Sequence, residues 1–400
     1  MLLALALSFT SPAYPCAGFV TPDIDGQVAS SDAQEALLVA NEDATVSVTY
    51  RVTYKGNAAD FAWIIPVPGP VVSVEEGTDV VFDALAASSA PVWDKLTAAD
   101  GEDDDAPGCG CAGASKSADV SLGGEPGDAR DISDSDGIDV TDQGYAGDFA
   151  YTVLDADDAG GLVAWLEANG YAPGVAAPAI AAYVDDPDVT YRWVAVQLRP
   201  EAVGTGDTDV VLPPLTVRWG ADDGAAPVVA YPSRMASTSM LAEVRTTLYL
   251  SGMGTPELGN DWSVGGRGNE WSEYALYAPS PDTTAADTFA AELRRIGGAS
   301  RGYWYTWGGY AGGDNGNVAP SAAEQAILDG FVARFDGIHV PAVHTTDLTF
   351  TAGPESYVQT VIAIPADPVE SDASAAWLLP VGLAGAAIRR RRAVVVSPRG

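Results

Sequence analysis

The pattern of apolar and polar positions is most legible in residues 149–198, where it predicts a strand, a helix, a short helix and a second strand. The run Phe149–Leu154 is apolar and rich in residues that favour strands. Leu162, Trp165 and Leu166 follow at helical spacing, so one stripe of this helix is expected to be buried. Aromatic residues at such spacing usually pack in a core, and we therefore do not assign Trp165 to a ligand site.

Capping and helix-terminating residues mark the ends of these predicted elements. Asp155 is the candidate N-cap of the first helix, and Gly170 stands where a C′ glycine would end it. Tyr171, which follows, is expected to pack against that helix end. Pro178 can begin the short helix at its first turn. Val189–Leu198 then predicts a strand that is covered on both faces.

Two further runs predict a β-hairpin. Ala44–Lys55 alternates strictly between apolar and polar positions, and Phe61–Val67 is apolar on both faces, with a turn between them. Other apolar runs predict four more strands, the last two as a closing pair: Val210–Trp219, Val244–Leu250, Leu348–Thr351 and Tyr357–Ile364.

Two more helices have recognisable starts. Thr78 is the candidate cap of a short helix that buries Phe82 and Leu85. Ser321 and Glu324 form a capping-box pattern. The helix that follows is expected to bury four apolar residues: Ile327, Leu328, Phe331 and Phe335. The sequence therefore predicts an α+β fold, with a predominantly antiparallel sheet and a few packed helices.

Residues 98–144 interrupt this pattern. They are rich in Asp, Gly and Ser and contain little apolar material, so we expect a long, acidic, disordered insertion. The run Asp131–Asp139 resembles a calcium loop, but Ile132 stands where an EF-hand needs its first acid. No cofactor is predicted, and calcium is left only as a weak alternative.

The net charge of the chain limits the classes of partner that it can bind. The formal net charge is −35, and the acids are spread along the whole chain. Such a surface argues against nucleic acid or anionic lipid as a partner of the body.

The N-terminus predicts export. Residues 1–15 contain the apolar run Leu2–Leu7 and a small-residue cleavage pattern at Ser11–Ala13, as in a secretory signal peptide. Residues 16–365 would then form the exported body, with a candidate sub-boundary near residue 255.

The C-terminus predicts membrane attachment. After a linker at 366–372, the segment 373–400 contains the uncharged run Ala373–Ile388, followed at once by Arg389–Arg392. An apolar helix with cytoplasmic arginines would leave the body outside, although the run is shorter than the ~20 residues of a relaxed span. The segment resembles the sorting tails of some Gram-negative surface proteins.

The three cysteines leave one unpaired in any disulfide scheme. Either Cys109 bonds to Cys111, or Cys16 bonds to one of them.

Catalytic motifs are missing from the sequence. There is no G-x-S-x-G, H-E-x-x-H, P-loop or Rossmann fingerprint, and the acids are too numerous for one pair to stand out. His339 and His344, five apart on an extended chain, would face opposite ways. We predict no catalytic and no metal-ligating residue.

Aromatic residues gather in two glycine-rich stretches that we expect to be loops. The candidate binding residues are Trp262, Trp271, Tyr303, Trp304 and Trp307. Such groups can stack on sugars or bind a protein partner. The alternative is that they anchor irregular loops to the sheet.

Several runs in the first half of the chain resemble one bacterial family. Cys16–Phe19, Ala59–Pro68, Gly110–Cys111, Leu162–Tyr171 and Trp193–Leu198, in this order, are similar to the exported family labelled domain of unknown function 2330. The resemblance implies secretion in a Gram-negative bacterium and no particular reaction.

Three functional hypotheses follow. The first is an exported cell-envelope or surface protein with a binding or structural role, attached to the membrane by its C-terminal helix and contacting an envelope glycan or protein. The second is a secreted hydrolase of extracellular or envelope polymer that uses carboxylates near the aromatic stretches. The third is calcium-assisted adhesion through residues 98–144.

Overall fold

The structure is a computed structural model. It describes residues 18–19, 33–54, 62–89, 92–96, 137–199, 210–222, 225–238, 244–259, 263–264, 274–277, 303–310, 320–339, 341–355 and 360–365.

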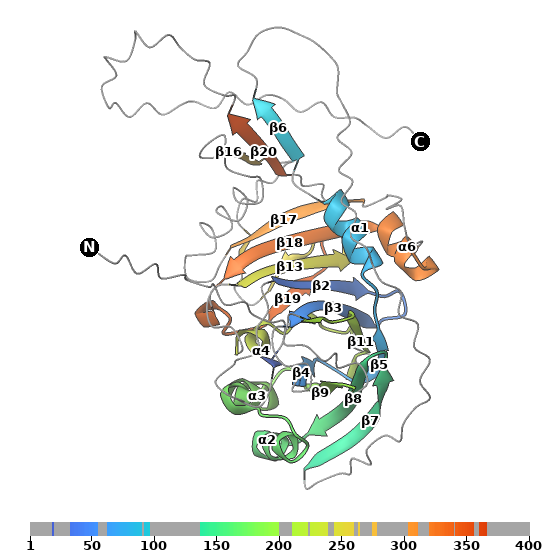
Figure 1. The fold of residues 1–400 in the computed structure, drawn as a ribbon, viewed down its shortest axis with the longest axis vertical. Helices are drawn as coiled ribbons and strands as arrows, with labels where there is room; N and C mark the ends of the chain where they lie inside the picture. Colours follow the sequence, from blue (N-terminus) through green and yellow to red (C-terminus); the bar gives the residue numbers. More distant parts are fainter. Residues whose placement is uncertain are drawn as a thin grey trace, which may run out of the picture.

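The largest sheet, here called the main sheet, has nine strands (Figure 1). In spatial order they are β15 (Ser263–Val264), β17 (Tyr303–Tyr310), β18 (Phe331–His339), β13 (Val244–Ser251), β2 (Ala33–Ala40), β3 (Val46–Tyr54), β11 (Leu215–Trp219) and β5 (Val71–Glu76), with β10 (Val210–Val211) beside β3. Strands β13 and β2 run parallel, as do β15 and β17, and the other neighbours are antiparallel.

A second sheet of five strands is entirely antiparallel. Its order is β1 (Gly18–Phe19), β4 (Ala62–Val67), β9 (Arg192–Leu198), β8 (Phe149–Ala156) and β7 (Ile138–Ala146). Two small sheets complete the described strands. One is formed by β12 (Val229–Tyr231), β19 (Leu348–Thr351) and β14 (Glu257–Leu258), and the other by β16 (Tyr274–Tyr277), β20 (Thr360–Pro365) and β6 (Val92–Leu96).

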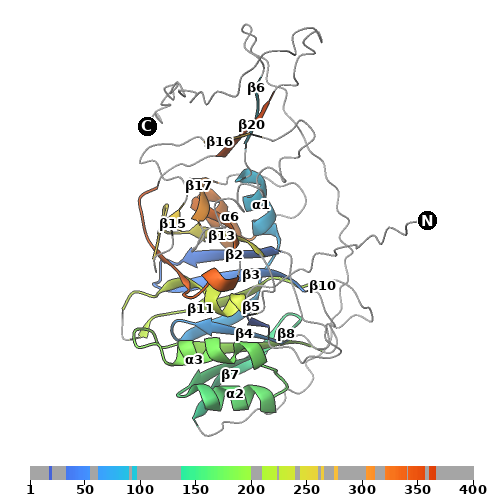
Figure 2. The same ribbon diagram turned by 90° about the vertical axis from the view of Figure 1, so that its left-hand side faces the viewer.

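Short helices cover the outer faces of the two larger sheets (Figures 1 and 2). Helices α2 (Ala159–Ala168) and α3 (Ala177–Val184), with the 3-10 turn η2 (Gly174–Ala176) between them, pack on the five-stranded sheet. Helices α1 (Val80–Ser88) and α6 (Ala322–Asp329) pack on the main sheet. The five-residue α4 (Ser233–Ser237) and the turn η4 (Pro341–Val343) lie near the small β12–β19–β14 sheet. The predicted α+β class, mostly antiparallel, is confirmed.

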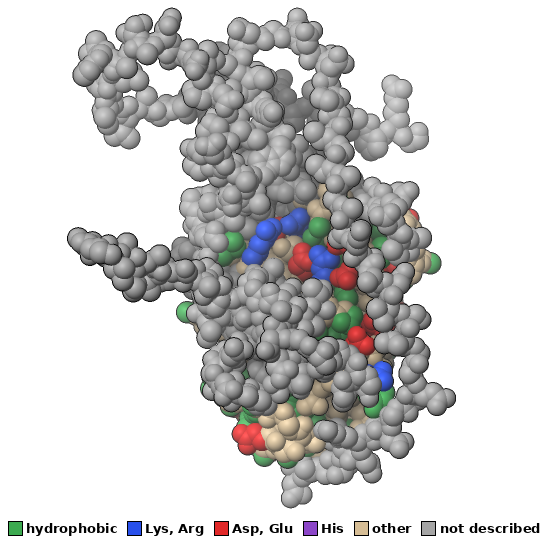
Figure 3. Space-filling view, in the orientation of Figure 1, with side chains coloured by type: hydrophobic (Ala, Val, Ile, Leu, Met, Phe, Trp, Pro, Cys, Tyr) green, Lys and Arg blue, Asp and Glu red, His purple; other side chains and the backbone are tan. Residues whose placement is uncertain are grey.

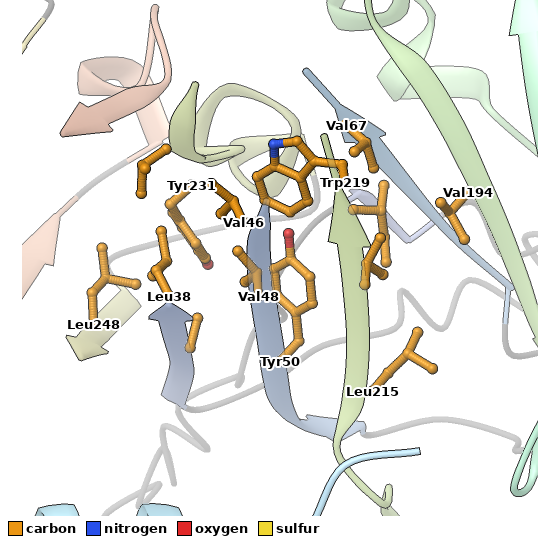
Figure 4. Packing of buried hydrophobic residues seen from close by; sticks show 14 of the residues in the cluster. Leu38, Val46, Val48, Tyr50, Val67, Val194, Leu215, Trp219, Tyr231 and Leu248 are labelled. Carbon is orange, nitrogen blue, oxygen red and sulfur yellow. The ribbon is translucent and has the colours of Figure 1, made fainter. Parts of the chain in front are cut away.

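The core lies between the inner faces of the two larger sheets (Figure 4). Alternation along β3 places Val46, Val48 and Tyr50 on the inner face, as the sequence predicted, and all three are buried. The opposing five-stranded sheet contributes Val67 and Val194. Because successive residues alternate, the other face of each sheet is left to be covered by helices, and the described layers are helix, sheet, sheet, helix.

The unit at residues 149–198 forms as predicted. Trp165 and Tyr171 are both buried and stack with ring centroids 6.3 Å apart. Gly170 has φ of +86°, and the Tyr171 and Gly170 amides donate to the carbonyls of Leu166 and Glu167. This is the glycine-terminated helix end expected from the sequence.

Two predicted strand pairs are wrong. Strands β3 and β4 do not form a hairpin, because β3 belongs to the main sheet and β4 to the five-stranded sheet. Likewise β19 and β20 lie in different small sheets. In both cases, two strands that follow each other in the sequence belong to different sheets and do not pair.

Three element boundaries are also corrected. Strand β8 extends through Ala156, so Asp155 lies in the strand and Asp158 caps α2 by accepting from the Gly161 amide at 2.8 Å. Helix α1 has Asp79 as its N-cap residue, without a side-chain cap, and Thr78 instead donates its hydroxyl to Glu324. The strand β7 occupies residues 138–146, so the last residues of the predicted insertion are folded.

The helix predicted after Ser321 is shorter than expected. Its capping box with Glu324 is present, but α6 ends at Asp329. Phe331 and Phe335 lie in strand β18 and face the core between the sheets. Residues four apart share a face in a helix and also in a strand, so their spacing alone did not separate the two.

A close backbone approach makes Gly254 a test of this packing. Its φ is +64°, and a Cβ placed there would lie 2.2 Å from the Gly353 carbonyl oxygen. The substitution Gly254→Ala should therefore lower the free energy of unfolding by more than about 1 kcal/mol.

Urea denaturation measures this change. The control is Gly220→Ala, because a Cβ at Gly220 meets no atom within 4 Å. It should change stability by less than about 0.5 kcal/mol. Equal effects of the two substitutions would contradict the proposed close contact.

Candidate functional site

Two groups of buried ionisable side chains stand out in the described structure. The first, here called the Asp347 cluster, consists of Tyr183, Tyr191, Arg234 and Asp347. Helix α3 places Tyr183 against the five-stranded sheet, where its ring packs edge-on at 4.8 Å from Tyr191 and 5.8 Å from Trp193. Its hydroxyl donates to Asp347 Oδ1 at 2.5 Å. Tyr183 and Asp347 are 1% and 5% exposed, so this hydrogen bond is buried.

Helix α4 supplies the other contacts of the cluster. The Arg234 amide donates to Asp347 Oδ1 at 3.0 Å, and the Met235 amide donates to the Tyr183 hydroxyl at 3.2 Å. The Arg234 guanidinium lies 5.2 Å above the Tyr183 ring. It also donates to the carbonyls of Thr345 and Ala182 at 3.0 and 3.1 Å. Arg234 therefore joins α3 to the segment that precedes β19.

Burial dominates the electrostatics of this cluster. It raises the pKa of Asp347 to about 6, although the donated hydrogen bonds from Tyr183 and Arg234 oppose the shift. Burial also raises the pKa of Tyr183 and Tyr191, and the neighbouring Asp347 carboxyl adds to both shifts. Asp347 can thus hold a proton close to neutral pH, which is the property expected of a general acid or of a proton-sensitive contact.

The second group, here called the Arg334 cluster, lies on the outer face of the main sheet. Arg334 Nε is 2.7 Å from Asp336 Oδ2, and its Nη2 donates to Oδ1 at 3.1 Å. Thr247 donates its hydroxyl to the same Oδ1 at 2.8 Å, and Arg245 approaches it at 3.3 Å. Arg334 also donates to Ser89 Oγ at 2.9 Å, which links the sheet to the end of α1.

This ion pair is almost completely buried, since Arg334 is 7% and Asp336 is 2% exposed. Burial disfavours the charged form of Asp336, but Arg334 and Arg245 outweigh it and hold the pKa of Asp336 below its usual value. Asp336 in turn raises the pKa of Arg334 against the effect of burial. Both groups are charged at neutral pH, and their bidentate geometry offsets the loss of hydration.

The same outer face has a second, more exposed ionic group. Arg51 on β3 pairs with Glu35 on β2 and with Asp83 on α1, the latter at 2.8 Å. Its guanidinium lies 4.8 Å from the Phe82 ring centroid. Figure 3 shows basic and acidic side chains side by side on this face of the molecule. These contacts fasten α1 to the main sheet.

The predicted aromatic residues fall partly within the described structure. Tyr303, Trp304 and Trp307 lie on strand β17, and not in a loop as we expected, because the stretch pairs with β18 over its whole second half. The register sets Trp307 opposite Arg334, so β17 adjoins the Arg334 cluster. The other predicted residues lie outside the described residues: Trp262, Trp271, Cys16, Cys109 and Cys111.

Sequence reasoning missed both clusters. Asp347 lies 164 residues from Tyr183 in the chain. No local motif connects them. Within the described ranges, no group of three or more His, Cys, Asp or Glu residues is placed to hold a metal ion. In the same part of the chain, no helix is long and apolar enough to cross a membrane. The predicted C-terminal helix lies outside it.

Comparison with models of protein families shows which family the chain belongs to. The model of uncharacterized proteins conserved in bacteria, DUF2330, matches residues 12–350. The chain belongs to this family. The DUF2330 match covers every run on which the resemblance was based, and that prediction is confirmed. No protein of curated function matches the chain.

Comparison with solved structures gives only distant likenesses for this DUF2330 protein. The crystal structure of baculovirus P35 matches at 10% identity with a TM-score of 0.31, covering 80% of this chain and 96% of that chain. A mutated baculovirus P35 after caspase cleavage matches at 10% identity with a TM-score of 0.28, covering 58% and 74%. Scores this low do not establish a shared fold.

The Arg334 cluster predicts a large effect for a small substitution. Asp336→Asn keeps the shape of the side chain but leaves the buried Arg334 without its counter-charge. Removing one partner of a buried ion pair should lower the free energy of unfolding by about 3 kcal/mol.

Urea denaturation at neutral pH measures the loss. The matched control is Asp83→Asn, whose carboxylate also pairs with an arginine but is 70% exposed. Exposed pairs contribute at most about 1 kcal/mol. A loss for Asp336→Asn no larger than for the control would show that the buried pair is not stabilising.

Proposed function

We propose that this protein is an exported component of the bacterial cell envelope that binds an envelope glycan or a partner protein and does not catalyse a reaction. The bacterial family, the apolar run near the N-terminus and the apolar run Ala373–Ile388 with its following arginines support export. Mass spectrometry of the protein from cell fractions should find residues 1–15 removed. Recovery of the intact chain from the cytosol would contradict this expectation.

One observation carries the non-catalytic proposal. The two buried carboxyls in the described structure whose pKa values are shifted, Asp336 and Asp347, are both bonded to other groups of the fold. Asp336 Oδ1 accepts hydrogen bonds from Thr247 and Arg334, and Oδ2 lies 2.7 Å from Arg334 Nε. Asp347 accepts on one oxygen from both α3 and α4. A general acid or base must reach the proton of a substrate, and these carboxyls are turned to partners in the protein.

The proposed binding surface is the outer face of the main sheet around β17. Of the five aromatic residues on this strand, Tyr303, Tyr305 and Trp307 alternate onto the face of the Arg334 cluster, and Trp307 pairs with Arg334 itself. Aromatic rings stack on sugars and anchor protein interfaces. The buried ion pair beside the strand would hold such a surface rigid. A rigid surface loses little conformational entropy on binding.

Binding to purified envelope polysaccharide tests this surface. Loss of anchoring aromatic residues typically costs about 2 kcal/mol, or roughly thirtyfold in Kd. The double substitution Tyr305→Ala with Trp307→Ala, at the positions that pair with Asp336 and Arg334, should therefore weaken binding by roughly that factor in a co-sedimentation assay.

The control is Val175→Ala, which trims a side chain that is 76% exposed on η2, on the other outer layer. It should bind as the unmodified protein does. Unchanged binding by the double variant, with its circular dichroism intact, would exclude this strand as the binding surface.

A secreted hydrolase remains the second candidate, and Asp347 is the observation that favours it. Its pKa of about 6 suits a general acid. The same polysaccharide incubations can be assayed for new reducing ends. Release of reducing ends by the unmodified protein, abolished in Asp347→Asn, would replace the binding proposal with the hydrolase.

A further inference from the structure

Asp347 lies where three segments of the chain meet. Tyr183 comes from α3, Arg234 and Met235 come from α4, and Asp347 ends the segment 341–347 that leads into β19. Ser233 adds a hydrogen bond from its hydroxyl to the Thr346 carbonyl at 3.0 Å. Four of the bonds described above cross between α4 or α3 and this segment, and none of them belongs to a helix or a sheet ladder.

Asp347 connects all three segments through its hydrogen bonds. Its Oδ1 receives the Tyr183 hydroxyl and the Arg234 amide, and the Tyr183 oxygen receives the Met235 amide. Tyr183 is fully enclosed and Met235 is 0% exposed, so separation of α4 from α3 would expose both. The segments can therefore separate only if the hydrogen bonds to Asp347 are broken together.

Charged and titratable groups surround the carboxyl on several sides. Tyr183, Tyr191 and Asp186 act on it from the α3 side, and Arg234 acts from α4. His344, which is 4% exposed, lies three residues away in the same segment. Arg234 favours the carboxylate, whereas burial and Asp186 favour the protonated acid.

We propose that Asp347 is the proton-sensitive element of a clasp formed by α4 and residues 341–347, which docks on α3 and loosens when the carboxyl ionises. A neutral carboxyl keeps both accepted hydrogen bonds on Oδ1 while avoiding a buried charge. An ionised carboxyl strengthens those bonds but must be stripped of water inside the protein, and the loss of hydration is the larger effect.

The direction of the pH dependence follows from linkage. The closed clasp has a pKa near 6 at Asp347, whereas an opened, hydrated carboxyl returns towards its usual value of 3.8. Between these values the closed form binds more protons than the open form. The stability of the closed form is therefore greatest in acid, falls as the pH rises from about 4 through 6, and levels off at about pH 7. This is opposite to the usual behaviour of a salt-bridged carboxylate.

Hydrogen exchange measures opening of the clasp directly. The amides of Arg234 and Met235 should be monitored between pH 5 and pH 7, with rates divided by their intrinsic exchange rates. Linkage predicts that their protection decreases about tenfold over this interval. Amides in β13, within the main sheet, should show no comparable change.

Two variants test whether Asp347 is the group that causes this pH dependence of amide protection. Asp347→Asn keeps an acceptor oxygen but cannot ionise, so protection of both amides should become independent of pH. Asp188→Asn removes an exposed acid just beyond α3 and should retain the full dependence. If Asp347→Asn retains the dependence, His344 or another group carries it and the proposal is wrong.

Titration of the Asp347 carboxyl by carbon-detected NMR gives a second, independent readout. The hydroxyl of Tyr183 lowers the pKa of Asp347, so Tyr183→Phe should raise the midpoint above that of the unmodified protein. This measurement needs only the folded, unmodified chain as its reference. A midpoint near 4 in that chain, or one that Tyr183→Phe leaves unchanged, would overturn the proposal even if Asp347→Asn fails to fold.

Discussion

The apolar contact between the inner faces of the two larger sheets is the interaction on which the rest of the structure depends. This core contains every second residue of β3, β11, β13 and β18 from the main sheet, and of β4, β8 and β9 from the five-stranded sheet. Burial of one large apolar side chain is worth about 1.5–3 kcal/mol, and this core includes Tyr50, Trp63 and Trp219. Because side chains alternate along each strand, this core also determines which residues lie on the outer faces of the two sheets. Residues left outside are either covered by a helix, as Tyr249 is by Phe82 of α1, or are paired polar groups.

The buried charges can be understood from this layering. Outer-face positions such as Arg334 and Asp336 lie on central strands, where helices and neighbouring strands shield them from water. A charge in such a position is tolerated only with a partner of good geometry, and the bidentate contact supplies it. Asp347 is in the opposite situation, because its donors are mostly neutral and its desolvation is not fully offset. The same physical rule thus gives one carboxyl a lowered pKa and the other a raised one.

Local chemistry allowed much of the fold to be predicted. The inward residues of β3, the buried stripe of α2 and the glycine end at Gly170 each depend on a few neighbouring residues, and all are confirmed. Pairing partners were not accessible in this way. β3 and β4 are apolar neighbours separated by a turn, which is the usual hairpin signal, yet they line the core from opposite sides. Phe331 and Phe335 fit a helix and a strand equally well, and the sheet on either side of β18 decided between them.

The candidate sites could not be predicted for a related reason. In the sequence, Tyr183 is one residue of a short predicted helix, Arg234 lies between two predicted strands, and Asp347 is one acid among many. Their common environment arises when the small β12–β19–β14 sheet sets α4 and residues 341–347 against α3. Met235 and Tyr183 pack in one apolar cluster at this junction, and its polar contacts are a few hydrogen bonds around one carboxyl. In the proposed clasp, the charge of this carboxyl makes the junction sensitive to pH.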